Sequence, residues 1–280
     1  RDSTEYLSLS EALIQEYEGD PFVHTTIAPH APYTVNDAAL KRCAEISDKY
    51  GVPIHMHVNE TAVEVSDSLR DHHERPIDRL ERLGLLNERL IAVHSVHASD
   101  KDITKMAAAH ASVCHCPCSN LKLASGFAPI AKFLKAGINL GIGTDGAASN
   151  DKLDMLGETR LAAMLAKAVA QDPTAAPVFA MLEAATLGGA RALRWDADIG
   201  SLEIGKAADL FAIDLGTPES LPVADPAAQI LYSAGRECIT HTWVDGRLIM
   251  EKHARAAYPQ TDALAAAALC AQKWQSRLKN

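Results

Sequence analysis

Two histidines and one aspartate accompany short apolar segments that have the composition of buried β-strands. His57, His94 and Asp145 each lie near or just after the end of such a segment. Imidazole and carboxylate groups are ligands of divalent metals, and a catalytic metal site keeps one position open for water. A metal-bound water has its pKa lowered to about 7, which makes hydroxide available near neutral pH. The three residues therefore predict a hydrolytic metal site.

Glu60 lies three residues beyond His57, on the loop beside the predicted metal. There its carboxylate could carry protons without binding the ion. Each residue has a structural alternative. His57 alone could be a hydrogen-bonded structural histidine, and Asp145 could cap a helix that begins near Ser149, which is a frequent role of aspartate.

The combination of these residues favours the catalytic interpretation. Gly143 and Gly146 flank Asp145 and allow a close approach of the backbone to a ligand, which a helix cap does not require. His55 shares a strand face with His57, because residues two apart in a strand point the same way. We expect His55 to be buried and hydrogen-bonded, and His97 to be a surface or capping residue.

The cysteines do not form a recognisable zinc motif. Cys114, Cys116 and Cys118 alternate with single residues, whereas structural zinc sites usually place about two to four residues between cysteines. This alternation is the spacing of one strand face, so we interpret these residues as buried small side chains. Six cysteines among 280 residues are too few for a disulfide-stapled domain and favour a reducing, cytoplasmic location.

The elements that must position these residues alternate between strands and helices. The sequence predicts strands at 23–28, 53–58, 90–96, 111–116 and 139–143, with helices that include 37–50 and 77–83. This alternation predicts βα units around a parallel sheet. In a parallel α/β barrel the carboxyl ends of the strands hold the active site. His57, His94 and Asp145 are therefore expected on one side of the sheet.

A different pattern begins after about residue 190. Residues 199–213 are rich in turn-forming residues and run into a strand. The segments at 239–244 and 247–250 flank Asp245-Gly246, a strong signal for a two-residue hairpin turn. The alanine-rich segment at 261–278 predicts a helix. A small β-layer therefore follows the α/β region.

The composition is that of an ordinary globular protein, with 48% hydrophobic and 22% charged residues. A net charge of -9 repels nucleic-acid backbones, so we expect no nucleic-acid partner. No apolar run approaches the roughly 20 residues that span a bilayer, so we expect no membrane partner.

Several motifs resemble the amidohydrolase superfamily, and the most similar branch is the 5-methylthioadenosine/S-adenosylhomocysteine deaminases. The motifs, in chain order, are Ala28-Pro29-His30-Ala31-Pro32-Tyr33, His57-Val58-Asn59-Glu60-Thr61, His94-Ser95-Val96-His97, Pro117-Cys118-Ser119-Asn120-Leu121-Lys122-Leu123-Ala124-Ser125-Gly126 and Gly143-Thr144-Asp145-Gly146-Ala147-Ala148-Ser149-Asn150. The segment at 200–209 is widespread among amidohydrolases. The resemblance covers nearly the whole chain.

The resemblance implies a role for each site residue. His57 and Asp145 would bind one divalent metal, zinc or alternatively iron, and Asp145 would also take a proton from the attacking water. Glu60 would protonate the ring nitrogen next to the attacked carbon and then pass a proton to the departing ammonia. His94 would orient the hydroxide and stabilise the tetrahedral intermediate, and His30 would hydrogen-bond the purine nucleoside.

The implied fold is α/β, a (β/α)8 barrel of the metal-dependent amidohydrolase kind with a small β-sandwich. The family has a His-x-His pair of metal ligands on its first strand. His55-Met56-His57 is not that pair, because Glu60 and the motifs that follow place it on the fifth strand. We therefore expect this chain to lack the first strands. Residues 1–195 would form the carboxyl-terminal part of the barrel (about five βα units), 196–257 part of the sandwich, and 258–280 a helix.

The expected activity is hydrolytic deamination of an adenine-type nucleoside: 5-methylthioadenosine, S-adenosylhomocysteine or adenosine. The alternatives are hydrolysis of another nitrogen heterocycle (guanine, pterin, cytosine or a triazine) or an inactive fragment of such an enzyme. The segment at 23–30 contains no lysine that could bridge two metals, which favours a mononuclear site. We expect the intact protein to be a homo-oligomer.

Overall fold

In the computed structural model of the chain, residues 3–217, 220–251, 254–255, 265, 268–270 and 272–273 are described. The chain divides into two compact units, Arg1–Ser201 and Leu202–Asn280. Among the described residues, each unit has one four-stranded sheet. No helix among these residues is long and apolar enough to cross a bilayer.

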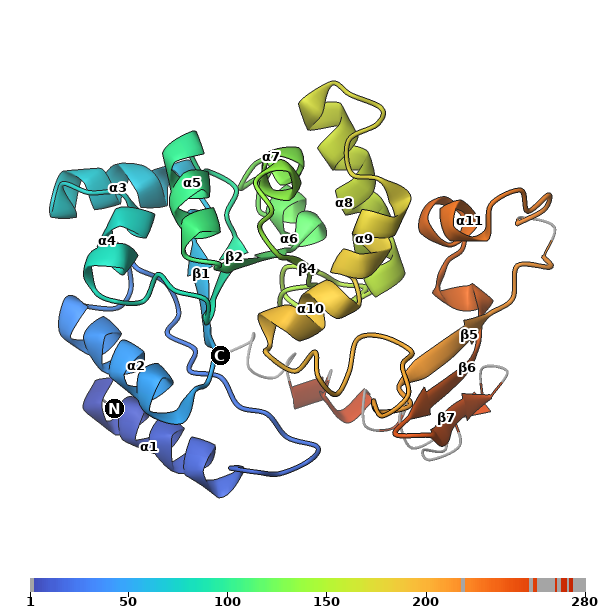
Figure 1. The fold of residues 1–280 in the computed structure, drawn as a ribbon, viewed down its shortest axis with the longest axis horizontal. Coiled ribbons are helices and arrows are strands. Elements are labelled where there is room, and N and C mark those ends of the chain that lie inside the picture. Colours follow the sequence, from blue (N-terminus) through green and yellow to red (C-terminus); the bar gives the residue numbers. More distant parts are fainter. Residues whose placement is uncertain are drawn as a thin grey trace. The chain divides into compact units, whose positions relative to one another are not determined.

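The sheet of the first unit is parallel and is covered by helices (Figure 1). Its strands lie side by side in chain order: β1 (Ile54–Val58), β2 (Leu90–His94), β3 (Ser112–His115) and β4 (Leu140–Ile142). Each strand except β4 pairs with the next one along the chain, for example Val58 with His94. These four strands confirm the predicted parallel sheet, with shorter boundaries.

The predicted strand at 23–28 is reduced to a single bridge. Ile27 pairs with Ile54 at the edge of β1, donating its N–H to Pro53 and accepting from His55. Pro29 follows closely and has no N–H to donate to a ladder. The regular ladder therefore stops after one bridge, and the loop that follows stays bonded to β1 only where His57 donates its N–H to the carbonyl oxygen of His30.

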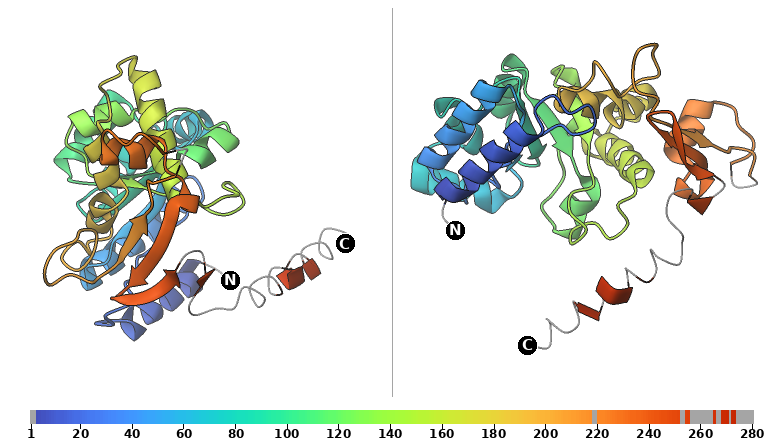
Figure 2. Two further views of the ribbon diagram at one scale, coloured as in Figure 1. Left: turned by 90° about the vertical axis from the view of Figure 1, so that its right-hand side faces the viewer. Right: turned by 90° about the horizontal axis from the view of Figure 1, so that it is seen from below.

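Helices connect the strands of the first unit and flank its sheet: α1 (Ser3–Glu16), α2 (Asp37–Tyr50), α3 (Ala62–His72), α4 (Pro76–Arg82), α5 (Asp100–Ala108), α6 (Pro117–Lys122), α7 (Ile130–Lys135), α8 (Met155–Ala170), α9 (Val178–Ala184) and α10 (Leu187–Ala192). The predicted helix at 37–50 is confirmed, and the one at 77–83 begins one residue earlier at Pro76. Proline suits a first helical position because it lacks the N–H that would be unpaired there. Helices α1 and α2 lie side by side in both views of the chain (Figures 1 and 2).

Local signals explain where several helices begin. Asn36 accepts a hydrogen bond from the N–H of Ala39 at the start of α2, and Gly51 ends that helix with a left-handed φ of 69°. Ser99 and Asp102 form a reciprocal capping box at the start of α5. These caps fix where each helix begins.

The core lies between the sheet and these helices. All five residues of β2 are buried, which is typical of a strand in a parallel sheet covered on both faces. The largest fully buried side chains come from strands and helices alike and include Ile54, Met56, Leu90, Leu40, Leu80, Met106 and Phe133. This core fixes the carboxyl ends of the strands relative to one another.

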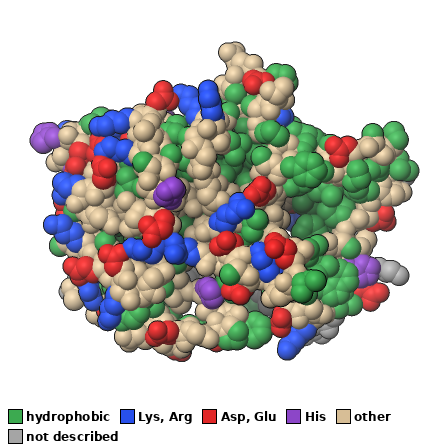
Figure 3. Space-filling view, in the orientation of Figure 1, with side chains coloured by type: hydrophobic (Ala, Val, Ile, Leu, Met, Phe, Trp, Pro, Cys, Tyr) green, Lys and Arg blue, Asp and Glu red, His purple; other side chains and the backbone are tan. Residues whose placement is uncertain are grey.

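A buried arginine links the helices to the loop that carries His30. Arg79 is 2% exposed, and it donates to the carbonyl oxygens of Pro32 and Val35 and to the carboxylate of Asp37. On the face shown in Figure 3, acidic and basic side chains are interspersed. Arg82 also forms an ion pair with Glu74.

The second unit contains an antiparallel sheet of β5 (Leu210–Ile213), β6 (Ile239–Val244), β7 (Arg247–Glu251) and β8 (Ala254–Arg255), with the short helices α11 (Pro226–Tyr232) and η1 (Arg236–Cys238). Strands β6 and β7 confirm the predicted hairpin and are drawn in orange to red in Figure 2. Asp245 and Gly246 both have positive φ, 49° and 72°, as a type I′ turn requires. The predicted helix at 261–278 lies mostly outside the described residues.

Candidate active site

The ends of three parallel strands bring His57, His94 and Asp145 together. One potential ligand atom from each side chain lies within 4.8 Å of the others. The Nε2 atom of His57 is 4.0 Å from Oδ1 of Asp145, and the Nε2 atom of His94 is 4.0 Å from Oδ2. The structure therefore places these three sequence-predicted residues around one point.

The backbone turns sharply where these side chains leave the sheet. His94, Ser95 and Asp145 have φ values of 71°, 48° and 59°, and Asn59 after β1 has 54°. Residues other than glycine rarely occupy this left-handed region, and such strain clusters at functional sites. The strained turns aim the side chains of His94 and Asp145 at the common point.

Hydrogen bonds determine which ring nitrogen of each histidine carries the proton and which carries the free lone pair. The Nδ1 atom of His57 lies 2.8 Å from the carbonyl oxygen of His30, which can only accept, so Nδ1 carries the proton. The Nδ1 atom of His94 lies 2.7 Å from the amide oxygen of Asn120 and carries the proton for the same reason. Both rings therefore present an Nε2 lone pair toward Asp145.

The carboxylate of Asp145 is held ionised by its neighbours. Burial alone would raise its pKa, but hydrogen bonds from Ser119, Ser149 and the N–H of Gly146 outweigh this effect and hold the pKa below its ordinary value. The hydroxyls of Ser119 and Ser149 donate to Oδ2 at 2.6 and 2.7 Å. Two imidazole lone pairs and an ionised carboxylate form a donor set that fits a divalent metal such as zinc.

Asp145 does not cap a helix. The helix after it, α8, begins at Met155 and is capped by Asp154. Instead, Asp145 receives the hydroxyl hydrogen bond of Ser149. The structural alternative for Asp145 is therefore wrong.

Glu60 lies on the loop between β1 and α3, and its Oε1 atom accepts a hydrogen bond from Ser125 at 3.1 Å. Behind it lies Glu64, which is 4% exposed. The two carboxylate oxygens of Glu64 accept the backbone N–H groups of Asn59 and Glu60 at 2.8 and 2.7 Å. Burial raises the pKa of Glu64, although these backbone hydrogen bonds oppose the rise. Glu64 thus anchors the backbone that carries Glu60.

Sequence reasoning missed Glu64 as a supporting residue. The signal was the spacing Thr61-x-x-Glu64, which resembles a capping box. Thr61 caps α3 by accepting from the N–H of Glu64. The carboxylate of Glu64 then extends one turn back to the residues before the helix.

Helix α6 and the turn after it also support the site through residues that sequence reasoning used only for the resemblance. Ser119 donates to Asp145, Asn120 accepts from His94, and Ser125 donates to Glu60. One short segment therefore contacts three of the predicted reactive side chains.

A cavity of about 550 Å³ opens beside this cluster and is lined by His30, His57 and Asp145 among other residues. His30 is exposed, with Nδ1 2.9 Å from the Thr34 hydroxyl and its ring edge-on to His57 at a centroid distance of 5.0 Å. His94 and Glu60 are not among the lining residues, and His94 is 1% exposed. The cavity is large enough for a small organic substrate.

His55 lines this cavity and is half-buried rather than buried. It is hydrogen-bonded to Cys114, as predicted. The strand alternation that turns His57 toward the cavity turns His55 there as well.

His97 is neither a surface nor a capping residue. Its Nε2 atom lies 2.7 Å from the carbonyl oxygen of Ser125, and Ser99 caps the helix that follows.

The cysteines at 114, 116 and 118 are free thiols, but they do not form one buried strand face as predicted. Cys116 is buried, Cys114 and Cys118 are half-buried, and Cys118 lies in α6 because Pro117 ends the strand. Cys114 and Cys116 line the cavity wall. Hydrogen bonds from Cys116 and His55 lower the pKa of the Cys114 thiol despite its burial.

A Cβ atom added to Gly143 would lie 2.8 Å from Sγ of Cys114 and 3.1 Å from Sγ of Cys116. Gly143, which also lines the cavity, therefore makes room for the two sulfur atoms.

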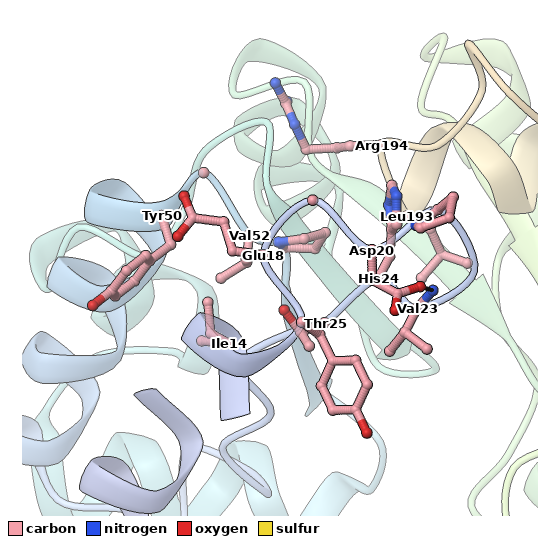
Figure 4. A pocket seen from close by; sticks show the side chains of 15 residues that line it. Ile14, Glu18, Asp20, Val23, His24, Thr25, Tyr50, Val52, Leu193 and Arg194 are labelled. Atoms are coloured by element: carbon pink, nitrogen blue, oxygen red, sulfur yellow. Dashed lines mark hydrogen bonds between the residues drawn. The ribbon is translucent and has the colours of Figure 1, made fainter. Parts of the chain in front are cut away.

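A second pocket of about 460 Å³ lies at the other end of β1 (Figure 4). Its lining includes Ile14, Tyr50, Pro53 and His24, and the ring of His24 stacks on Trp195 at a centroid distance of 3.9 Å. Pro53 directly precedes β1, so this pocket lies at the amino ends of the strands. Active sites of α/β barrels lie at the carboxyl ends, which favours the cavity beside His57.

Comparison with known proteins agrees with this arrangement. The sequence profile of the amidohydrolase family matches residues 2–249. The chain belongs to the amidohydrolase family. Its first unit, with a parallel sheet and surrounding helices, corresponds to part of the α/β barrel of this family.

Three relatives illustrate the similarity. The 5-methylthioadenosine/S-adenosylhomocysteine deaminase of Syntrophobacter fumaroxidans is 41% identical over 245 residues, which are 88% of this chain and 56% of that protein. An adenosine deaminase from Xanthomonas campestris with bound zinc is 46% identical, with a TM-score of 0.94 over 99% of this chain and 62% of that one. A mutant atrazine chlorohydrolase from Arthrobacter aurescens, complexed with zinc and atraton, is 26% identical and has a TM-score of 0.89. The match covers 96% of this chain and 60% of that one.

Proposed function

We propose that this protein is a metal-dependent aminohydrolase that replaces the exocyclic amine of an adenine-type nucleoside with oxygen and releases ammonia. The observation that carries the proposal is the convergence of His57, His94 and Asp145 within 4.8 Å at the carboxyl ends of parallel strands. Glu60 follows the first of these strands and provides a carboxyl group for proton transfer.

The metal would be held by His57 and Asp145, and zinc is the proposed ion because the similar adenosine deaminase contains it; iron is the alternative. When bound, the metal supplies Lewis-acid activation of water at neutral pH. The Nε2 lone pair of His57 fits this role, because the Nδ1–H group of the same ring donates to the carbonyl oxygen of His30.

The chain's own residues then move the protons. Asp145 is ionised and accepts a proton from the attacking water. Glu60 donates a proton to the ring nitrogen beside the attacked carbon. It then takes the hydroxyl proton of the resulting adduct and passes it to the departing ammonia, and the proton held by Asp145 returns to Glu60 through solvent to complete the cycle. His94 hydrogen-bonds the water through Nε2 and orients it. General acid–base groups within hydrogen-bond reach of the reacting atoms contribute about 10²- to 10⁴-fold to a rate.

The substrate class rests on similarity together with the cavity. The relatives named as methylthioadenosine/S-adenosylhomocysteine deaminases and the adenosine deaminase support a nucleoside. His30 is exposed at the cavity beside His57, where its ring can hydrogen-bond the purine nucleoside. The homo-oligomeric state and the cytoplasmic location stay predictions.

Hydrolysis of a triazine is a second candidate, because triazine hydrolases share the fold at 26–27% identity. The experiment is to load the protein, at its full natural length, with zinc and measure ammonia release. The substrates are 5-methylthioadenosine, S-adenosylhomocysteine, adenosine, guanine and a chlorotriazine. The proposal expects the adenine nucleosides to have the highest kcat/KM. Turnover of only the triazine or only guanine would overturn it.

A further inference from the structure

The backbone that carries Glu60 is held from one side. Glu64 accepts the N–H groups of Asn59 and Glu60 with both carboxylate oxygens, and Thr61 caps the helix that follows. These bonds fix the Cα atom of Glu60. They leave its long side chain free to adopt several rotamers, and selecting one of them costs up to about 2 kcal/mol of conformational entropy.

The carboxylate of Glu60 is held from the opposite side. Among the residues that the structure describes, Ser125 supplies the one hydrogen bond to this carboxylate, from Oγ to Oε1 at 3.1 Å. Ser125 is 65 residues away in sequence and belongs to the turn after α6. The contact therefore connects two separate βα units at the site.

Ser125 is itself rigidly placed. It is 6% exposed, its N–H donates to the carbonyl oxygen of Asn120 at 2.8 Å, and its own carbonyl accepts from Nε2 of His97 at 2.7 Å. The next residue, Gly126, has a φ of 122°, and an added Cβ there would lie 3.0 Å from Cγ1 of Val96. The main chain on both sides of Ser125 is thus fixed, and burial leaves its side chain little room to change rotamer.

We propose that Ser125 is a positioning residue that holds the carboxyl group of Glu60 in the orientation needed for proton transfer to the substrate ring. This inference rests on the proposed function. It extends that function to a residue outside the metal cluster, and Ser125 acts through Glu60 rather than on the substrate. A hydroxyl in a fixed direction selects one rotamer of Glu60, and general acid–base catalysis requires the acid within hydrogen-bond reach of the reacting atom.

The test compares three variants of the zinc-loaded protein at its full natural length: Ser125→Ala, Ser125→Thr and Ser68→Ala. Ser125→Ala should lower kcat for the best nucleoside by about 10- to 100-fold, with KM changed less than about threefold and zinc content unchanged. Ser125→Thr restores the hydroxyl and should recover most of kcat.

Ser68→Ala is the matched control. Ser68 is 8% exposed, and its hydroxyl donates to the carbonyl oxygen of Glu74 at 2.8 Å, away from the metal cluster. This variant loses a buried serine hydrogen bond of similar kind, and we expect kcat close to wild type. The comparison separates lost positioning from general loss of stability.

Two results would overturn the inference. One is a Ser125→Ala protein that keeps kcat within about twofold of wild type. The other is a loss of kcat in Ser125→Ala that Ser125→Thr does not repair, although both variants are folded and hold zinc. A failure of the proposed function looks different, because the wild-type protein would then release no ammonia from any of the nucleosides. If Ser125→Ala does not fold, Ser125→Cys, which keeps the size but donates weakly, replaces it with the same expectation.

Discussion

The Nδ1 atom of His94 lies 2.7 Å from the amide oxygen of Asn120, inside helix α6. Both residues are almost completely buried. Since an amide oxygen only accepts, this contact keeps the proton on Nδ1 and leaves Nε2 of His94 facing Asp145. A single buried amide therefore determines how this histidine takes part in the chemistry.

Replacing Asn120 should alter the reaction without removing the metal ligands. We expect Asn120→Leu, which has similar size and no acceptor, to lower kcat by about 10- to 100-fold, as losses of supporting partners typically do. Steady-state kinetics with a parallel zinc assay checks this. Wild-type kcat in this variant would show that the orientation of His94 does not depend on Asn120.

Glu60 and Asp145 should respond differently to substitution. Glu60→Gln keeps shape but cannot donate or accept the proton, so we expect turnover to fall below detection while one zinc per chain remains. Asp145→Ala removes a ligand, so both zinc and turnover should be lost. Metal analysis of the two purified variants checks both expectations. Zinc loss from Glu60→Gln would show that Glu60 is a ligand, and full occupancy in Asp145→Ala would remove Asp145 from the ligand set.

The lowered pKa of Asp145 predicts a pH-dependent effect of Ser119. A carboxyl whose folded pKa lies below its unfolded value adds stability above the unfolded pKa, and this is lost as pH falls through the folded pKa. Ser119→Ala removes a donor to the ionised form and so raises the folded pKa. We expect metal-free Ser119→Ala to be less stable than wild type by about 1–3 kcal/mol at pH 7.

The difference should shrink as the pH falls below the ordinary pKa of aspartate and through the lowered pKa of folded Asp145, because the carboxyl then becomes protonated in both proteins. Denaturant unfolding at a series of pH values measures the difference. The pKa explanation would be wrong if the difference stayed constant from about pH 7 down to the lowest pH at which both proteins still fold.

The room made by Gly143 predicts a compensating pair of substitutions. Gly143→Ala would place a methyl group within 2.8 Å of the Cys114 sulfur, and such overpacking costs about 1–3 kcal/mol. Adding Cys114→Ala removes the nearer sulfur. We expect the double variant to be less destabilised than the sum of the two single variants, by about 1 kcal/mol. Thermal unfolding of the four proteins completes the cycle, and strict additivity would contradict the steric explanation.

The central cluster could be predicted because its geometry follows from simple rules. The carboxyl ends of neighbouring parallel strands share one edge, so polar residues at three such ends must lie close together. Predicting that His57, His94 and Asp145 lie together required only this rule and the strand pattern. The hairpin at Asp245-Gly246 could also be predicted, because its turn depends on two adjacent residues that tolerate positive φ.

The supporting contacts could not be predicted in this way. Ser125 and Glu60 are 65 residues apart, and Asn120 and His94 are 26 apart. Their pairing depends on how α6 docks against two strand ends, which no periodicity encodes. The contacts of Gly143 could not be predicted for a similar reason, because the sulfur atoms of Cys114 and Cys116 approach it from the neighbouring strand β3 and the residue after it. The segment at 23–28 had strand composition, but only Ile27 found a ladder partner.

The left-handed backbone at His94 and Asp145 has a consequence for evolution and design. Glycine is the residue best suited to such a conformation, so at both positions the amino acid that folds most easily is one that can perform no chemistry. Selection for stability therefore favours glycine at these two positions, whereas selection for activity favours His94 and Asp145. A search for thermostable variants that does not also screen for turnover would be drawn toward glycine at these positions.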